Sequence, residues 1–201
     1  SGKVKRVALG MAVTLLALVV ALTHPEALGL GEGFSSEAAW QLGRWFYLPA
    51  AVFWFLLVPF WLRARWVLPG ALGGFLIGLL LILPTWLALI QLRQLGPWAL
   101  IGLMAVVWMA DTGAYFCGRK FGRRKLAPNI SPGKTWEGAI GGAALVIIYG
   151  VSIGLVFSYV PLAQVPLLFL GMLVFAALSV IGDLFESLLK RQAGLKDSSA
   201  I

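Results

Sequence analysis

Long uncharged apolar runs alternate with short charged segments along the chain. A membrane-spanning helix needs about 20 mostly apolar residues, because it crosses about 30 Å of hydrocarbon at about 1.5 Å per residue. The run 138–182 holds 45 residues without a charge, which is too many for one crossing, and Pro161 and Pro166 divide it. The pattern therefore predicts six crossings, over about 7–23, 45–62, 70–92, 98–117, 138–160 and 166–189.

These spans predict the fold class, an all-α polytopic membrane helix bundle of about six transmembrane helices. Residues 1–97 hold the first three spans, and residues 98–201 hold the other three, with the candidate chemistry and a basic loop over 118–137. Cytoplasmic loops carry an excess of Lys and Arg. Fourteen of the sixteen basic residues fall on the side of the N-terminus, so both termini are expected to be cytoplasmic.

The composition agrees with a membrane protein and excludes several other classes. Of 201 residues, 60% are apolar and 12% charged, whereas soluble domains average about 45–50% and about 25%. The chain is too apolar for a disordered protein, and its single cysteine, Cys117, excludes a disulfide scaffold. The net charge of +8 follows mostly from loop topology, so no nucleic-acid partner is expected.

Three carboxylates, Asp111, Asp183 and Glu186, lie within otherwise apolar predicted helices. Each costs about 2.5–3.5 kcal/mol at the bilayer centre, so such groups usually face a protein interior and serve a function. All three fall in the last third of spans that run toward the cytoplasm, level with the basic loop. Asp183 and Glu186 share one helical face, but Lys190 follows Glu186 by four residues, so a local Glu186–Lys190 pair is an alternative.

Carboxylates beside a dense set of cations indicate phosphate chemistry with a divalent metal. Mg²⁺ typically binds one or two carboxylates together with substrate phosphates, and Lys or Arg neutralises the remaining charge. Asp183, Asp111 and Glu186 are therefore candidate Mg²⁺ ligands, and a second cation is left open. The arrangement predicts phosphoryl chemistry at the inner membrane surface, with a lipid entering from the bilayer and a nucleotide from the cytosol.

The basic loop contains Gly133-Lys134-Thr135, which is similar to the end of a nucleotide-binding P-loop. That assignment fails, because Pro128 stands where the motif needs glycine and because a membrane helix, not a β-strand, precedes the loop. The segment still offers hydroxyls, a cation and backbone N–H groups just before a helix N-terminus, which favours anions. The candidate phosphate-binding residues are Ser131, Gly133, Lys134, Thr135 and Arg124, and an ordinary juxtamembrane turn is the alternative.

Two segments resemble a known family. The first comprises Trp108 to Tyr115 (WMADTGAY) and then Leu126 to Gly138 (LAPNISPGKTWEG). The second begins with GDLFESLLKR at Gly182 and continues through Lys196-Asp197-Ser198, which is similar to the start of the signature Ser-x-x-Lys-Arg-x4-Lys-Asp. From about residue 98 to residue 199, the chain resembles the bacterial phosphatidate cytidylyltransferases, also called CDP-diacylglycerol synthases.

The resemblance implies transfer of a cytidylyl group from CTP to phosphatidic acid, giving CDP-diacylglycerol and pyrophosphate in the presence of Mg²⁺. It also implies a homodimer in the bacterial inner membrane, with several spans and an active site on the cytoplasmic side. By resemblance, Asp183 is the metal ligand, supported by Asp111 and Glu186. The residues that the resemblance implies for catalysis and phosphate contact are Asp183, Lys134, Lys190, Arg191, Lys196 and Asp197.

One departure from the family concerns the end of the signature. In the family it continues into a His-Gly-Gly-x-x-Asp-Arg-x-x-Asp-like segment with further acidic residues, and this sequence stops at Ile201, before that segment. Family members are also longer, so segments at both ends are expected to be missing here. We therefore expect an incomplete metal site and a chain that is weakly active or inactive on its own.

Two other classes of function stay open at this point. A transporter or lipid flippase would use the three intramembrane carboxylates along a translocation route, and would place them near the midplane with access from both sides. A non-catalytic membrane protein with a basic lipid-headgroup patch would need no acids behind that patch. The position of the acids near one face favours the enzyme.

Overall fold

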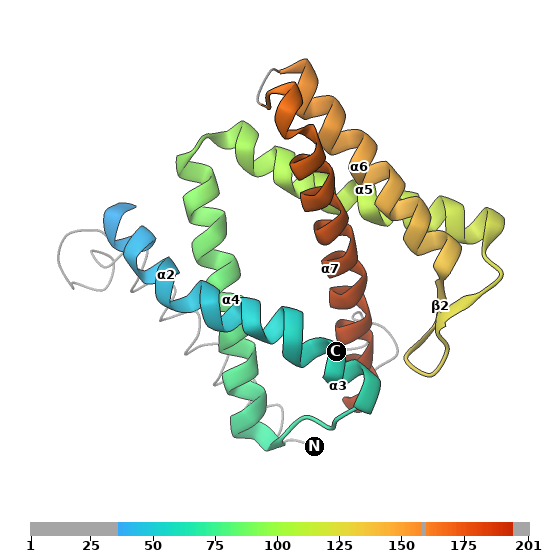
Figure 1. The fold of residues 1–201 in the computed structure, drawn as a ribbon. Helices are drawn as coiled ribbons and strands as arrows, with labels where there is room; N and C mark the ends of the chain where they lie inside the picture. Colours follow the sequence, from blue (N-terminus) through green and yellow to red (C-terminus); the bar gives the residue numbers. More distant parts are fainter. Residues whose placement is uncertain (1–35, 158–159, 195–201) are drawn as a thin grey trace. The chain divides into compact units, whose positions relative to one another are not determined.

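The computed structural model describes residues 36–157 and 160–194 (Figure 1). These residues divide into two compact units. Of the described residues, 36–53 and 68–97 belong to the first unit, and 54–67, 98–157 and 160–194 belong to the second. The predicted span over about 7–23 lies outside the described residues, as do Lys196 and Asp197.

Helices make up most of both units. Five helical stretches of the described residues are long and apolar enough to cross a membrane, by length and composition. This finding confirms the predicted all-α polytopic membrane fold. The elements are α2 (Ser36–Val52), the π-helix η2 (Phe53–Leu57), α3 (Val58–Ala64), α4 (Gly70–Gln94), α5 (Pro97–Phe121), α6 (Trp136–Val156), the 3-10 helix η3 (Leu162–Gln164) and α7 (Val165–Gln192).

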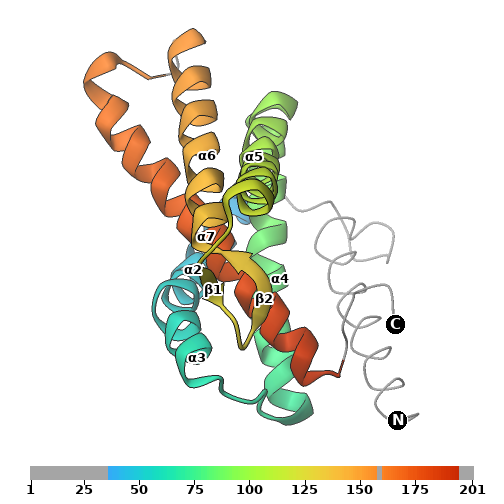
Figure 2. The same ribbon diagram turned by 90° about the vertical axis from the view of Figure 1, so that its right-hand side faces the viewer.

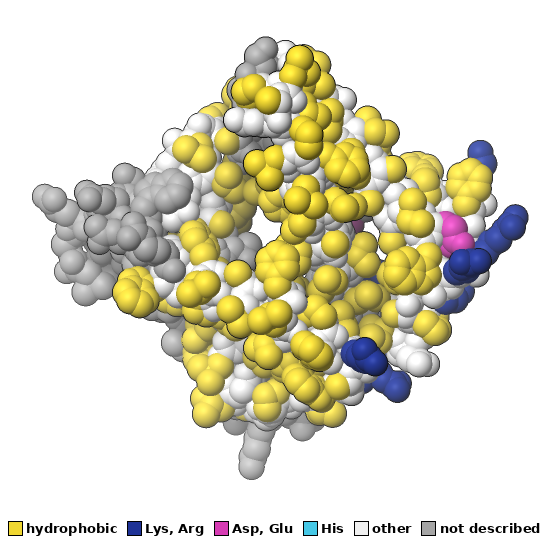
Figure 3. Space-filling view, viewed as in Figure 1, with side chains coloured by type: hydrophobic (Ala, Val, Ile, Leu, Met, Phe, Trp, Pro, Cys, Tyr) yellow, Lys and Arg dark blue, Asp and Glu magenta, His cyan; other side chains and the backbone are white. Residues whose placement is uncertain are grey.

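The described helices expose their apolar side chains, as helices that face lipid do. Leu167 and Leu170 of α7, for example, are 69% and 54% exposed. Figure 3 shows a surface on which hydrophobic side chains predominate, while Lys and Arg side chains gather where α5 ends. Since water would penalise so much exposed apolar area, these faces are those of a multi-pass membrane protein.

Within the first unit, α2 packs along α4. The Tyr47 hydroxyl of α2 donates a hydrogen bond of 2.7 Å to Gln91 Oε1 of α4. Gln91 is only 5% exposed, so this bond satisfies a polar group in an apolar setting. A polar contact of this kind fixes which faces of two apolar helices meet.

The helical path from α2 into α3 widens into the π-helix η2. Pro59, near the start of α3, has no N–H to donate to the carbonyl of Phe55, and its ring crowds that carbonyl. A local π turn relieves such crowding without ending the helix. The boundary between the two units falls in this segment, after Phe53.

Within the second unit, α5 and α6 lie side by side (Figure 2). They meet along a seam of glycines. A Cβ atom on Gly113 of α5 would lie 2.6 Å from the Gly141 carbonyl oxygen of α6, and one on Gly142 would lie 2.7 Å from the Ala110 carbonyl oxygen. Any larger residue would force the two backbones apart. The four-residue spacing of Gly138 and Gly142 therefore serves close helix packing.

The buried centre of the second unit joins three helices. Val146 of α6 is fully buried against Ala110 of α5 and Ala176 of α7. Farther along α7, Phe185 is 2% exposed and makes edge-to-face contacts with Trp54 and Trp61. These contacts fix the face of α7 that turns toward its neighbours.

The basic loop is not an irregular turn but an antiparallel hairpin of β1 (Lys125–Ala127) and β2 (Ser131–Thr135). Pro128 and Asn129 occupy the two central positions of its turn, which a 3.0 Å bond from Ile130 N–H to the Ala127 carbonyl closes. Both residue types favour turns, so the sequence supports the reversal locally. The hairpin lies beside α6 and α7 (Figure 2), which carries β2 into contact with α7.

Candidate active site

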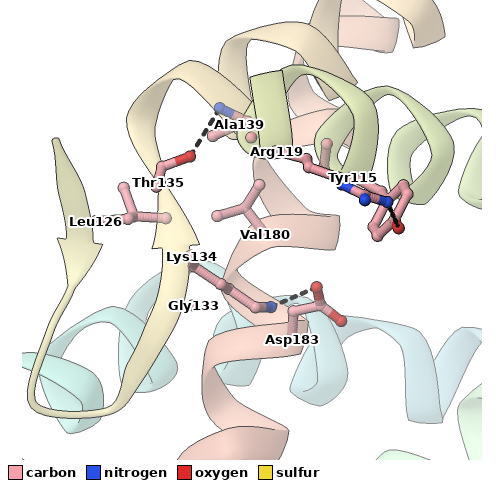
Figure 4. A pocket seen from close by; sticks show the side chains of 12 residues that line it. Tyr115, Arg119, Leu126, Gly133, Lys134, Thr135, Ala139, Val180 and Asp183 are labelled. Carbon is pink, nitrogen blue, oxygen red and sulfur yellow. Dashed lines mark hydrogen bonds and ion pairs between the residues drawn. The ribbon is translucent and has the colours of Figure 1, made fainter. Parts of the chain in front are cut away.

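A cavity of about 370 Å³ lies between the end of α5, the hairpin, the start of α6 and the last third of α7 (Figure 4). Its wall mixes small apolar residues with charged and hydroxyl groups. The lining residues are Ala114, Tyr115, Gly118, Arg119, Leu126, Gly133, Lys134, Thr135, Gly138, Ala139, Val180 and Asp183. Such a mixed cavity suits a ligand that is charged at one end and apolar at the other.

Lys134 of β2 and Asp183 of α7 form an ion pair on this wall (Figure 4). The lysine side chain is 26% exposed and the aspartate side chain 49% exposed, so both groups still face the cavity. Strand β2 brings Lys134 to α7. The neighbours of Lys134 in the strand, Gly133 and Thr135, line the same cavity. The hairpin thus brings together two predicted site residues that are far apart in the sequence.

The N-terminus of α6 opens onto the cavity. Thr135 caps the helix, with its Oγ1 accepting a 3.2 Å hydrogen bond from the Gly138 N–H. Thr135, Gly138 and Ala139 all line the cavity. Backbone N–H groups at a helix start favour anions, so this wall and Lys134 together suit phosphate groups.

Asp111 of α5 and Asp183 of α7 both line a second, smaller cavity of about 20 Å³. The predicted convergence of these two carboxylates is therefore seen in the structure. A volume of this size holds about one water molecule. Ser179, one helical turn before Asp183, adds a hydroxyl to the same lining. This residue was not a candidate from the sequence, although its four-residue spacing from Asp183 places both on one face of α7.

The two aspartates fit a metal that is only partly held by protein. Among residues 36–157 and 160–194, no group of three or more Asp, Glu, His or Cys side chains could hold a metal ion. Mg²⁺ typically takes one or two carboxylates and completes its shell with water and substrate phosphates. Asp111 and Asp183, beside a phosphate-binding wall, are compatible with that mode of binding.

The other candidates on α7 engage partners outside both cavities. Glu186 pairs with Lys190 at 2.6 Å, one turn along the same helix, which is the local pair left open from the sequence. The Arg191 Nε donates to the Ile130 carbonyl at the tip of the hairpin. A phosphate contact by Arg191 would therefore use its terminal guanidinium nitrogens.

Two predicted phosphate contacts, Ser131 and Arg124, line neither cavity. Tyr115 and Arg119 line the larger cavity, and the Arg119 Nη1 donates a 2.8 Å hydrogen bond to the Tyr115 hydroxyl. Glu137, which was not a candidate either, accepts hydrogen bonds from the backbone N–H groups of Arg123 and Arg124. The sequence gives only a weak sign that Tyr115, Arg119 and Glu137 have a role, because each looks like an ordinary aromatic or charged residue at the membrane interface.

Known proteins with similar sequences are cytidylyltransferases. A sequence profile of the cytidylyltransferase family matches residues 4–201. A phosphatidate cytidylyltransferase of Pseudomonas aeruginosa is 38% identical over 192 residues, which are 94% of this chain and 66% of that protein. Its counterparts in Haemophilus influenzae and Bacillus subtilis are 42% and 39% identical over 53% and 56% of this chain. No solved structure matches the chain.

The matched segments are parts of longer relatives. The chain spans 66% of the Pseudomonas aeruginosa protein, 38% of the Haemophilus influenzae protein and 42% of the Bacillus subtilis protein. The profile match nevertheless covers nearly all of this chain, including both segments whose motifs resemble the phosphatidate cytidylyltransferases. On these matches, the chain belongs to the cytidylyltransferase family.

Proposed function

We propose that this chain carries the phosphate-binding and metal-binding core of a phosphatidate cytidylyltransferase, which transfers a cytidylyl group from CTP to phosphatidic acid. The observation that carries the proposal is the meeting of Lys134 and Asp183 on one cavity wall, at the N-terminus of α6. The relatives are phosphatidate cytidylyltransferases, which supports the choice of substrates and favours the enzyme over the transporter or flippase.

In the proposed reaction, an oxygen of the lipid phosphate attacks the α-phosphorus of CTP. A new P–O bond forms there, and the bond to the β-phosphate breaks, so the products are CDP-diacylglycerol and pyrophosphate. The attacking oxygen is already ionised at neutral pH, so no strong base is needed. Rate enhancement then comes from positioning the two phosphates and neutralising their charge.

The residues of the larger cavity divide this work. Lys134 leaves Asp183 to contact a substrate phosphate, and the backbone and hydroxyl of Gly133 and Thr135 orient the phosphate at the start of α6. Asp183 and Asp111 would hold Mg²⁺ through their carboxylate oxygens. When bound, the metal neutralises negative charge on the phosphates and on the leaving pyrophosphate.

Residues of the basic loop 118–137 and of the signature that begins at Ser187 would add to this work. We assign supporting phosphate contacts to Ser131, Arg124, Lys190, Arg191 and Lys196, and a place in the same signature to Asp197. We assign no metal contact to Glu186, because it does not line the small cavity that Asp111 and Asp183 share and because it pairs with Lys190.

The proposed setting is the bacterial inner membrane, with the cavity on the cytoplasmic side and the protein acting as a homodimer. Charge supports the orientation, because six of the sixteen Lys and Arg residues lie within 119–134, beside the cavity. A nucleotide would then reach the cavity from the cytosol, and the lipid would reach it from the bilayer.

The test is a reconstituted assay with labelled CTP and phosphatidate, in the presence and absence of Mg²⁺. It uses the chain alone and a version extended past Ile201 with the corresponding segment of the Pseudomonas aeruginosa relative. We expect Mg²⁺-dependent CDP-diacylglycerol from the extended protein, and loss of product in its Asp183→Asn variant. A folded extended protein that forms no product would refute the proposed function.

A further inference from the structure

The Glu137 carboxylate makes an unusual set of contacts at the second position of α6. Its Oε2 lies 3.1 Å from the Arg123 N–H and 3.2 Å from the Arg124 N–H, and its Oε1 lies 3.2 Å from the Arg124 N–H. An acidic residue in the first helical turn ordinarily stabilises its own helix through the dipole or a capping bond. Glu137 also binds the segment that leaves α5 and enters β1.

These bonds close the base of the hairpin. Beside them, the Trp136 N–H donates a 3.0 Å hydrogen bond to the Arg124 carbonyl, directly before β1 begins at Lys125. Lys125 in turn pairs with Thr135, the last residue of β2 and the cap of α6. The base of the hairpin and the start of the helix are thus held together by one carboxylate and one backbone bond.

The tip of the hairpin has its own anchor. There the Arg191 side chain donates to the carbonyl of Ile130, a residue only 7% exposed. Lys134 lies between the two anchors, on β2, and its ammonium group reaches Asp183 across the cavity wall (Figure 4). Glu137 lines neither cavity, so its connection to the site runs through the hairpin backbone.

We propose that Glu137 is a positioning residue that fixes the base of the hairpin and thereby holds Lys134 at the phosphate wall of the cavity. Its carboxylate accepts hydrogen bonds from two backbone N–H groups, and the Arg123 and Arg124 side chains are exposed. The structural part of this inference stands on the hydrogen bonds alone, and the catalytic part rests on the proposed function.

The structural part can be tested by limited proteolysis with trypsin, because the turn held by Glu137 contains Arg123, Arg124 and Lys125. In Glu137→Ala we expect cleavage in this turn to be about tenfold faster than in the wild type, since proteolysis follows the population of the opened segment. Glu137→Gln keeps one acceptor oxygen and should fall between the two. Fragment masses identify the cleaved bond.

The matched control is Gln192→Ala, which removes a different side-chain-to-backbone hydrogen bond in the same unit, the 2.7 Å bond to the Trp66 carbonyl. Cleavage in the 123–125 turn should be unchanged in this variant. Equal cleavage rates in the wild type, Glu137→Gln and Glu137→Ala would overturn the inference, whether or not the protein is an active enzyme.

The catalytic part is tested by a double-mutant cycle on the extended protein, with kcat/KM for CTP as the readout. Glu137→Ala alone should lower kcat/KM about tenfold. In a Lys134→Ala background it should lower kcat/KM little further, because residues that act through one contact are not additive. Additive losses would show a general structural role and would overturn the positioning role. If the wild type has no turnover, the proposed function fails, and the proteolysis still decides the role of Glu137.

Discussion

Two ion pairs on the last third of α7 look alike in composition and differ in position. Asp183 pairs with Lys134, which arrives on a separate element, strand β2, whereas Glu186 pairs with Lys190 one turn along its own helix. Only the first pair lines the larger cavity. Both acids were candidate metal ligands because they lie within an apolar helix, level with the basic loop. A partner on a second element thus keeps Asp183 at the cavity, whereas a partner on its own helix holds Glu186 away from it.

The largest effect is expected from Asp183→Asn, which removes the charge of the acid that lines both cavities. Neutral asparagine keeps the shape but loses the attraction to Lys134 and to a divalent cation. We expect kcat of the extended protein to fall about a thousandfold, in the range found when a central electrostatic group is removed. The measurement is product formation at saturating CTP. Helix content by circular dichroism should match the wild type, and a loss below tenfold would place the metal elsewhere.

Lys134→Ala is expected to have the next largest effect, because it removes the cation from the phosphate wall and leaves Asp183 without its partner. We expect kcat/KM for CTP to fall about a hundredfold, equivalent to about 2.7 kcal/mol. Lys134→Arg keeps the charge and should recover part of the loss, although guanidinium and ammonium differ in geometry. An unchanged kcat/KM in Lys134→Ala would remove the hairpin from the proposed mechanism.

Asp111→Asn tests whether Asp111, which lines the small cavity together with Asp183, belongs to the same metal site. Asp111 lies beside Asp183 there but does not line the larger cavity. We therefore expect it to weaken metal binding about ten- to hundredfold, as supporting groups of metal sites do. Mn²⁺ titration followed by electron paramagnetic resonance measures this without turnover. Ser179→Ala changes another residue of the same lining and should weaken Mn²⁺ binding less. Equal Mn²⁺ affinity in Asp111→Asn and the wild type would exclude Asp111 as a ligand.

The comparison also shows how much of the molecule its sequence predicts. The described membrane helices follow directly from long apolar runs. Lipid offers no hydrogen bonds, so the backbone of such a run forms its hydrogen bonds within a helix. The expected span of 70–92, for example, is observed as Gly70–Gln94. The meeting of Asp111 and Asp183 was also predicted from depth, since both acids fall in the last third of predicted spans that were expected to run in the same direction.

The hairpin was not predicted, and the reason is physical. Its strands are short and polar, with Pro132 and Gly133 inside β2, so neither alternation nor β-propensity marks them. Its contacts are tertiary, namely the anchors of Glu137 at the base and Arg191 at the tip, and the Lys134–Asp183 pair between them. None of these contacts is visible as a local spacing. A turn signal at Pro128 and Asn129 was available, and read with the flanking segments it would have suggested the reversal.

The smallest effect is expected from the Glu186–Lys190 pair, and it sharpens the contrast with Asp183. The Glu186 side chain is 60% exposed, and its partner lies four residues away on the same helix. Such pairs contribute about 0.3–0.5 kcal/mol, so Glu186→Gln should lower kcat of the extended protein less than threefold. A double-mutant cycle with Lys190→Met should give a coupling of this size in thermal unfolding. A hundredfold loss of kcat in Glu186→Gln, with Mn²⁺ affinity reduced in parallel, would instead make Glu186 a metal ligand equal to Asp183.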